Sequence, residues 1–420
     1  MATTPIDHVS FEHLGAVYFS EETVTFGTAG TERRAAPISD TVAAKASQVM
    51  VDAKKLSPIP FDAVTPAQGD KSGEVSFGYY LMPPPSLLDE NGTLPTDATM
   101  PQKIPLRVLF GGESVPEVGT QAATPTSATA ITVDSGDGED FPAGQIVAVY
   151  TNGTVGLEVA QVRSRSTDDL TLYPALSATP APDANVVQMV CFYPTRANSR
   201  SMSVAGTGRE TSRQFRFTGC TGGAALKFER DGMAQMEVNL KAATFAGPEA
   251  LSLAVTRSED AGVPIAVRNL VVWLQPCATT TRVNTAVETV AMELNFGMAH
   301  LPALTGSLEG KRGVFRSEGL TDTFARVTLE MPDNADVYTW YENQTELNCT
   351  VIARAGTAAT RRHVVAMAPQ CVIESYPERF KGANNLAKVR VVLRAKINEQ
   401  CSGTLDNEEL AQAPFILALG

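Results

Sequence analysis

Cys220 is the residue whose surroundings come closest to a catalytic pattern. It stands in the stretch FTGCTGGAALKF, with Gly219 before it and Gly222 and Gly223 after it. A cysteine on a tight glycine turn is a potential nucleophile, but it needs a histidine base close by in space. The chain has only four histidines, and no stretch around them resembles a catalytic motif: His8, His13, His300 and His363. We therefore expect Cys220 to belong to the scaffold.

The segment VDSGDGEDF is the second place where reactive side chains gather. Its carboxylates, Asp134, Asp137, Glu139 and Asp140, are of the type that binds calcium. The EF-hand spacing is absent and no helices are predicted beside it, so we interpret it as an acidic turn between strands. The sequence also lacks a P-loop, an HExxH motif and a dinucleotide-binding loop. We predict no catalytic, cofactor-binding or metal-binding residues, no cofactor and no enzymatic activity.

The element that positions Cys220 is predicted to be a β-hairpin. After the cysteine, the stretch LKFE alternates apolar and polar residues, and Asp231-Gly232 suits a tight turn. From Ala234 to Ala242, apolar and polar residues then alternate strictly over nine residues. This period of two predicts a strand with one apolar and one polar face.

One helix is predicted near the N-terminus, in SDTVAAKASQVMVDAKKL. Alanine and lysine favour helix there, and Ser39 or Asp40 is a plausible N-cap. The stretch PPPSLLDENGTLPTDATMPQKIP, residues 83–105, is predicted to be a long loop because its six prolines block regular structure. Most of the remaining sequence is strand-like, which predicts a mainly β protein with one helix.

Residues 123–190 are interpreted as a small inserted all-β module. The runs SATAITV, QIVAVYT, GLEVAQVRS, DLTLYPAL and NVVQMV are five short predicted strands separated by polar turns. This spacing is typical of a small barrel or sandwich.

Three landmarks recur in the same order along the chain. FGTA is echoed by FGMA, LMP by EMP, and Cys220 precedes MEVNLKA much as Cys371 precedes VRVVLRA. Their order favours two copies of one fold, with the insert confined to the first copy. The predicted domains are residues 1–122 together with 191–255, the inserted module 123–190, and residues 256–420.

Composition narrows the class of protein. The chain has 420 residues, 43% of them hydrophobic and 19% charged, which is typical of a globular protein. Its formal net charge of −12 argues against general attraction to nucleic-acid phosphates. The six cysteines form no CxxC pair and are expected to be free thiols. The first residues do not resemble a secretory signal, and no apolar run is long enough to cross a membrane.

The order of these features resembles the tail tube proteins of long-tailed, siphovirus-like bacteriophages. The segments that carry the resemblance are ETVTFGTAGTERRAAPIS, KIPLRVLFGGESV and FTGCTGGAALKFERDGMAQMEVNLKAATF. In the family a stretch of the type gC.G...l..e.G....v.f.lkg.. recurs, and the comparable residues here are Gly219, Cys220, Leu226, Glu229, Gly232 and Leu240. The similarity covers roughly a third of the chain.

The resemblance implies a tail-tube-type β-sandwich or barrel fold with a flanking helix. Such proteins assemble into stacked rings whose inner strands close into one large barrel, which leaves no free lateral edges. Two copies of the fold per chain imply trimeric, pseudo-hexameric rings, whereas one copy implies hexameric rings. The resemblance also implies that residues 83–105 reach a neighbouring ring. Tape measure and terminator proteins are the implied partners.

The implied location is the virion tail, assembled in the host cytoplasm, with DNA passing through the lumen without specific binding and no membrane contact. A lumen biased towards carboxylates offers phosphates no counter-charge. In the hairpin, however, Glu229 and Glu237 are balanced by Lys227 and Lys241. Two alternatives remain: a baseplate, distal-tail or other virion component, and an extracellular carbohydrate-binding β-sandwich. The second normally needs an export signal and aromatic platforms, and the chain has only two tryptophans.

Overall fold

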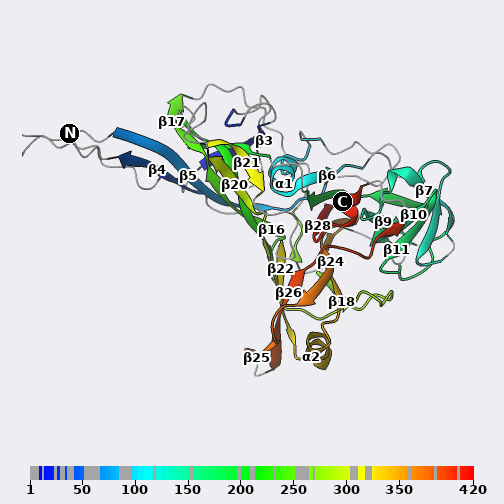
Figure 1. Ribbon diagram of the computed structural model, residues 1–420. Coiled ribbons are helices and arrows are strands. Elements are labelled where there is room, and N and C mark those ends of the chain that lie inside the picture. The colour runs from blue at the N-terminus through cyan, green and yellow to red at the C-terminus, as the bar shows by residue number, and fades with distance from the viewer. Residues whose placement is uncertain are drawn as a thin grey trace, which may run out of the picture.

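A computed structural model describes residues 9–11, 14–22, 26–28, 34–35, 42–51, 67–84, 96–97, 99–116, 120–125, 127–151, 156–195, 200–208, 213–229, 232–250, 264–267, 270–302, 311–316, 324–356, 361–382, 386–403 and 407–420 (Figure 1). Within these ranges the chain is mainly β, with large antiparallel sheets and three α-helices. The predicted class is confirmed.

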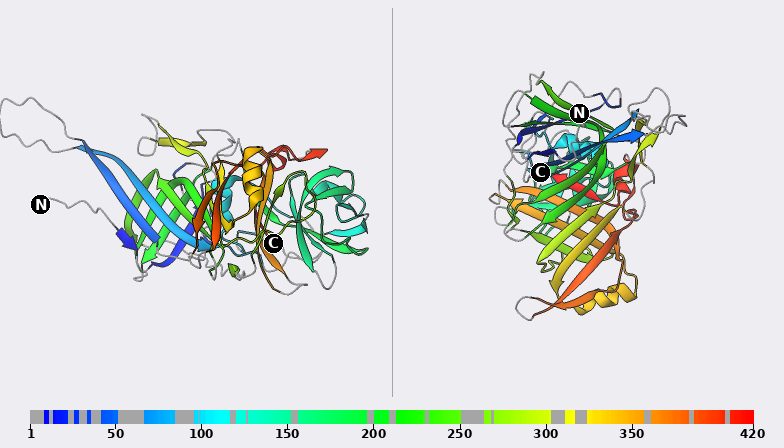
Figure 2. Two further views of the ribbon diagram at one scale, coloured as in Figure 1. Left: turned by 90° about the horizontal axis from the view of Figure 1, so that it is seen from below. Right: turned by 90° about the vertical axis from the view of Figure 1, so that its left-hand side faces the viewer.

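The central feature is a sheet that we call the long sheet. Eight described strands follow one another in it, each antiparallel to the next. In sheet order they are β4 (Val42–Val51), β5 (Ala67–Tyr80), β16 (Gln235–Ala242), β15 (Arg213–Phe228), β19 (Thr289–Leu294), β22 (Ala325–Pro332), β26 (Ala387–Ala395) and β24 (Arg362–Ile373). Figure 2 shows strands from both halves of the chain side by side across it. Buried residues alternate with more exposed ones in β16 and β19, so one face is packed and the other is polar.

Two smaller groups of strands share members with the long sheet. The first side sheet has the order β2 (Leu14–Glu21), β14 (Met202–Gly208), β15 and β17 (Thr244–Ala250). The second side sheet has the order β18 (Val271–Pro276), β23 (Leu347–Ala355), β24 and β28 (Ile416–Leu419). β15 and β24 begin in a side sheet and end in the long sheet.

The same scheme of pairings therefore occurs twice. We call β2, β4, β5, β14, β15, β16 and β17 the first unit, and β18, β19, β22, β23, β24, β26 and β28 the second unit. Each pairing within one unit has its counterpart in the other, in the same chain order, for example β5–β16 and β22–β26. The pair β15–β19 joins the two units within the long sheet.

Two of the three predicted landmarks lie at equivalent places in this scheme. Pro83 follows β5 and Pro332 ends β22. Cys220 immediately precedes Thr221, which begins the β15–β16 pairing, and Cys371 begins the β24–β26 pairing. FGTA and FGMA do not correspond, because they follow β2 and β19, which differ in their sheet partners.

One core extends through both units. Phe110 lies against three rings of the second unit's half of the chain, with centroids 5.1 Å away for Phe296, 6.2 Å for Phe324 and 6.3 Å for Phe415. In the first unit, Phe19 of the side sheet packs against the long sheet. Burial of large aromatic side chains is a major source of stability, so the units are joined by packing as well as by β15–β19.

The insert contains a closed barrel. Its strands, in barrel order, are β7 (Thr120–Pro125), β12 (Ala184–Gln188), β9 (Ile146–Tyr150), β10 (Leu157–Ser166), β11 (Asp169–Tyr173) and β8 (Ala130–Val133), and β8 pairs with β7 to close the circle. β27 (Ser402–Gly403) adds to β10. The five predicted runs all contain strands. The domain boundaries themselves stay a prediction.

The helix predicted from Ser39 is wrong. The described part of that stretch is β4, in which Val42 and Ala44 are buried while Ala43 and Lys45 are exposed. This period of two fits the pairing with β5. Sheet pairing therefore outweighed the helix propensity of the alanines, which amounts to less than about 1 kcal/mol per residue.

A helix instead begins at the end of the predicted proline-rich loop. α1 (Lys103–Phe110) contains Pro105 in its first turn, where a missing N–H costs no helical hydrogen bond. The side chain of Gln102 bonds to the backbone N–H and carbonyl of Met82, which fixes the start of α1 beside the end of β5. Residues 85–95 and 98 lie outside the described residues, so the predicted reach to another ring stays a prediction.

The remaining elements complete the description. They are β1 (Val9–Phe11), β3 (Arg34–Ala35), β6 (Gly111–Ser114), β13 (Val190–Pro194), β20 (Met298–Pro302), β21 (Lys311–Arg316), β25 (Glu378–Lys381), α2 (Ala335–Glu342), α3 (Glu408–Ala411) and the 3₁₀ turn Gly138–Asp140. β25 continues along β26 where β24 ends. No helix among these is long and apolar enough to cross a membrane.

Candidate assembly surface

Cys220 lies in the packed core of the first unit. Its side chain is fully buried, and this burial, together with the nearby carboxylate of Glu22, raises the pKa of the thiol well above its ordinary value. His300 donates from Nε2 to the carbonyl oxygen of Gly219 at 2.7 Å, and burial lowers the pKa of His300. A buried, protonated thiol is a poor nucleophile. The geometry favours the scaffold interpretation.

The buried carboxylate of Glu22 holds the backbone around Cys220 in place. Its carboxylate accepts hydrogen bonds from the backbone N–H of Gly27 and Gly219 at 2.7 and 2.8 Å, and from the hydroxyls of Ser201 and Ser203 at 2.6 and 2.7 Å. A buried carboxylate is stable when such donors surround it. Glu22 therefore ties the end of β2 to β14 and β15.

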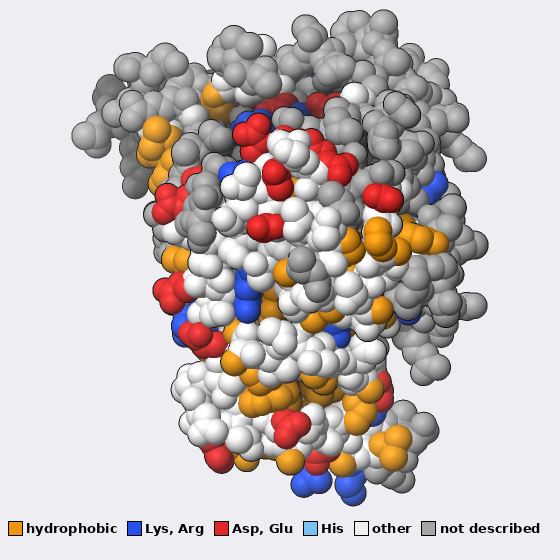
Figure 3. All heavy atoms as spheres, turned by 90° about the vertical axis from the view of Figure 1, so that its right-hand side faces the viewer, with side chains coloured by type: hydrophobic (Ala, Val, Ile, Leu, Met, Phe, Trp, Pro, Cys, Tyr) orange, Lys and Arg blue, Asp and Glu red, His pale blue; other side chains and the backbone are white. Residues whose placement is uncertain are grey.

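The acidic segment of the insert is a turn between β8 and β9, as predicted. Asp168 Oδ1 accepts hydrogen bonds from the backbone N–H of Gly136 and Gly138, which holds the turn closed. Across the described ranges, no group of three or more histidine, cysteine or acidic side chains is arranged to hold a metal ion. On the face shown in Figure 3, acidic side chains gather in the upper part, whereas acidic and basic ones are mixed lower down.

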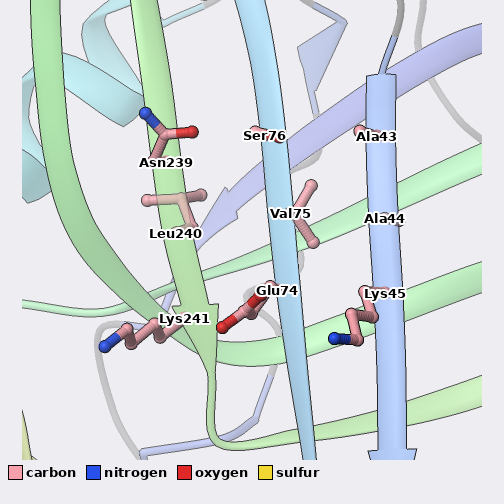
Figure 4. A pocket seen from close by; sticks show the side chains of 9 residues that line it. All are labelled: Ala43, Ala44, Lys45, Glu74, Val75, Ser76, Asn239, Leu240 and Lys241. Carbon is pink, nitrogen blue, oxygen red and sulfur yellow. The ribbon is translucent and has the colours of Figure 1, made fainter.

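The polar face of the long sheet extends across both units. In the first unit, Lys45, Glu74 and Lys241 stand directly opposite one another on β4, β5 and β16 (Figure 4). Further along the sheet, Lys227 bonds to Glu237 at 2.6 Å. Opposite charges on neighbouring strands stabilise the pairing modestly.

The second unit continues this pattern of paired charges. Arg390 lies 2.7 Å from Glu330 on one side and 3.3 Å from Glu378 on the other. Arg326 lies 2.8 Å from Glu374. On the described part of this face, basic and acidic side chains balance: Lys45, Lys227, Lys241, Arg326, Lys388, Arg390 and Arg394 against Glu74, Glu237, Glu288, Glu293, Glu330, Glu374 and Glu378. The face carries no excess of carboxylates.

The two ends of the long sheet expose strand edges. In the part of the chain that is described, β25 pairs only with β26, and the outer side of β4 pairs only with β1, over Val42–Ala44. Beside β25, the ring of Tyr376 lies 5.6 Å from those of Tyr338 and Tyr341, and Tyr376 is 62% exposed. Free edges and exposed aromatic side chains are typical of surfaces that bind other chains.

α1 is held by a cluster of charged side chains. Arg107 bonds to both oxygens of Asp97, at 3.1 and 2.8 Å, and also contacts Glu21 and Glu113 at 2.7 and 3.0 Å. Lys103 lies 2.8 Å from Glu113. These contacts fix α1 against β2 and β6.

No family model matches the sequence, and no curated protein matches it. Sequence reasoning drew attention to Lys227, Glu237 and Lys241 but missed Lys45 and Glu378, because single charged residues in a sequence do not reveal which strand edge they border.

Proposed function

We propose that this chain is a structural virion protein of the tail-tube type, three copies of which form a ring that stacks into a tube for DNA. The observation that carries the proposal is the repeated pairing scheme, with β15 and β19 joining two units into one long sheet. A junction that already joins two similar units is the pattern expected of a ring built from such units.

Closure of the ring accounts for the two free edges. Each chain contributes the eight long-sheet strands given above, so three chains would give a barrel of twenty-four strands. The side sheets and the core cover the apolar face, which leaves the polar face towards the lumen. A closed barrel has no lateral edges, which removes the tendency of free edges to aggregate.

The charges of the polar face suggest how DNA passes without binding. Strong attraction of DNA requires basic side chains that neutralise phosphates and release counterions. Here Lys227, Arg326 and Arg390 are already paired with carboxylates. The lumen would therefore carry matched charges, rather than the excess of carboxylates that the net charge suggested.

Electron microscopy of the purified protein, with the mass of any ring measured by native mass spectrometry, tests this function. The expected result is stacked rings or hollow tubes with three chains per ring. Single rings that never stack would favour the baseplate or distal-tail alternative. Dispersed monomers at every concentration would overturn the proposal.

A further inference from the structure

One strand pairing within the chain serves as a template for pairing between the two end strands of the long sheet in neighbouring copies. β15 of the first unit pairs with β19 of the second, antiparallel, from Ala224 opposite Leu294 to Phe228 opposite Val290. The counterpart of β19 in the first unit is β4, and the counterpart of the end of β15 in the second unit is β24 with β25. We infer that β25 of one copy pairs with β4 of the next copy in this same register. This inference rests on the proposed ring.

The register follows from equivalent positions in the two units. β16 and β26 both end on an alanine, Ala242 and Ala395. Counted back from these ends, Glu237 is equivalent to Arg390, and their partners across the sheet are Ala225 and Glu378. Glu378 thus occupies the position of Ala225.

The other edge is aligned in the same way. Lys241 is equivalent to Arg394, so their partners Glu74 and Arg326 are equivalent too. Glu74 pairs with Lys45, and Arg326 pairs with Glu293. Lys45 thus occupies the position of Glu293. Ala225 pairs with Glu293 inside the chain, and Glu378 occupies the position of Ala225, so Glu378 of one copy stands opposite Lys45 of the next.

The charges and the neighbouring surface fit this contact. Lys45 is exposed, the side chain of Glu378 is 67% exposed, and both lie on the polar face. At the equivalent position inside the chain, uncharged Ala225 faces Glu293, so this charge pair is specific to the contact between copies. The exposed ring of Tyr376 lies just before β25, where it supplies apolar area for the same contact.

When copies assemble in this register, β25 of one copy takes the place of β1 on the edge of β4 in the next copy. β1 pairs with Val42–Ala44, on the edge that β25 would use. Its pairing covers three residues, whereas the four residues of β25 would cover Val42–Lys45. β1 therefore shields part of the edge in a single chain and is displaced when the next copy binds.

A disulfide between copies tests the register. Residues directly opposite in antiparallel strands have Cα atoms about 4.5–5.5 Å apart, which suits a disulfide. A chain carrying both Lys45→Cys and Glu378→Cys is oxidised and analysed on a non-reducing gel, beside electron microscopy of the same sample. The expected result is linked dimers and trimers. The control pair, Lys241→Cys with Glu378→Cys, has its first cysteine two strands from the edge and is expected to stay unlinked.

The outcomes separate this inference from the proposed function. Rings without links, or equal linking of the control pair, would overturn the register while the ring stands. Linked chains without closed rings would overturn the ring and leave the pairing. Neither rings nor links would overturn both.

Charge reversal provides a second measurement. Lys45→Glu and Lys241→Glu each place a glutamate opposite Glu74, but only Lys45 borders the edge. We expect Lys45→Glu to raise the concentration for half-maximal ring formation by roughly tenfold, with partial recovery when Glu378→Lys is added, because that change also removes the exposed ion pair with Arg390. Equal effects of the two reversals, or no recovery, would contradict the register.

Discussion

The first and second units share one pairing scheme but differ in what covers their helices. In α1, which follows β5, seven residues are buried, and its Phe110 packs against Phe296 and Phe415. In α2, which follows β22, only Val337 is buried among its eight residues. α1 is thus buried with side chains from both halves of the chain, whereas α2 is largely unburied by the described residues, as expected if another copy covers it.

Phe110 of α1 should therefore affect the stability of the single chain, whereas Tyr376, which packs against α2, should affect ring formation. Phe110→Ala leaves a cavity in the core between the units and should lower the free energy of unfolding by about 4 kcal/mol. Tyr376→Ala should leave unfolding of the single chain unchanged and weaken ring formation by roughly tenfold. Denaturant unfolding and the concentration dependence of ring formation measure the two effects. Loss of monomer stability in Tyr376→Ala would contradict the comparison.

The ion pairs of the two units should differ in the same direction. Arg107→Met removes the cation that Asp97, Glu21 and Glu113 share in a partly buried cluster, which should cost about 3 kcal/mol of unfolding free energy even though Lys103 still pairs with Glu113 and Arg200 with Glu21. Arg390→Met in the second unit is the control, because its pairs with Glu330 and Glu378 are exposed. Its unfolding curve should coincide with that of the unaltered chain, and an equal loss in both variants would show that burial is not what separates them.

The regular parts of this architecture were predictable from local sequence. β16 was predicted because the alternation over Ala234–Ala242 reports directly which side chains are buried. Five of the six barrel strands were predicted from short apolar runs separated by polar turns, but β7 (Thr120–Pro125) was not, because its small and polar residues resemble a linker. β4 was not, since its alanines favour helix locally and only the pairing with β5 shows that Lys45 is on a polar face.

The candidate surface could not be predicted from local sequence, because it is formed by strands that are far apart in the chain. Strands β15 and β19 lie more than sixty residues apart, and pairings over such distances leave no local signal. The three landmarks suggested two copies, but one of them, FGTA with FGMA, does not correspond in the sheets. Glu378 and Lys45 become informative only when the equivalence of the two units is known.

His363 gives the second unit a dependence on pH. Burial, and then the nearby Arg361 and Arg354, lower the pKa of His363 to about 3. The native chain thus keeps this imidazole neutral, whereas the unfolded chain binds a proton below about pH 6.5. The contribution of His363 to the free energy of unfolding should be fully present above that pH. It should fall as the pH drops, by about 2 kcal/mol at pH 5. Denaturant unfolding at pH 7.5 and 5.0 measures it, and a His363→Gln variant should lose this part of the difference.

The thiols provide the comparison in which the two units should behave alike. Cys220 and Cys371 are both fully buried, and burial raises the pKa of each thiol well above its ordinary value. Since only the thiolate reacts, neither should react with a thiol reagent at pH 8 until the chain unfolds. Cys401, which is partly exposed, should react first among the six cysteines. Rapid labelling of Cys220 with slow labelling of Cys371, followed by mass spectrometry of the labelled peptides, would show that the two positions are not equivalent and would bring back the nucleophile interpretation.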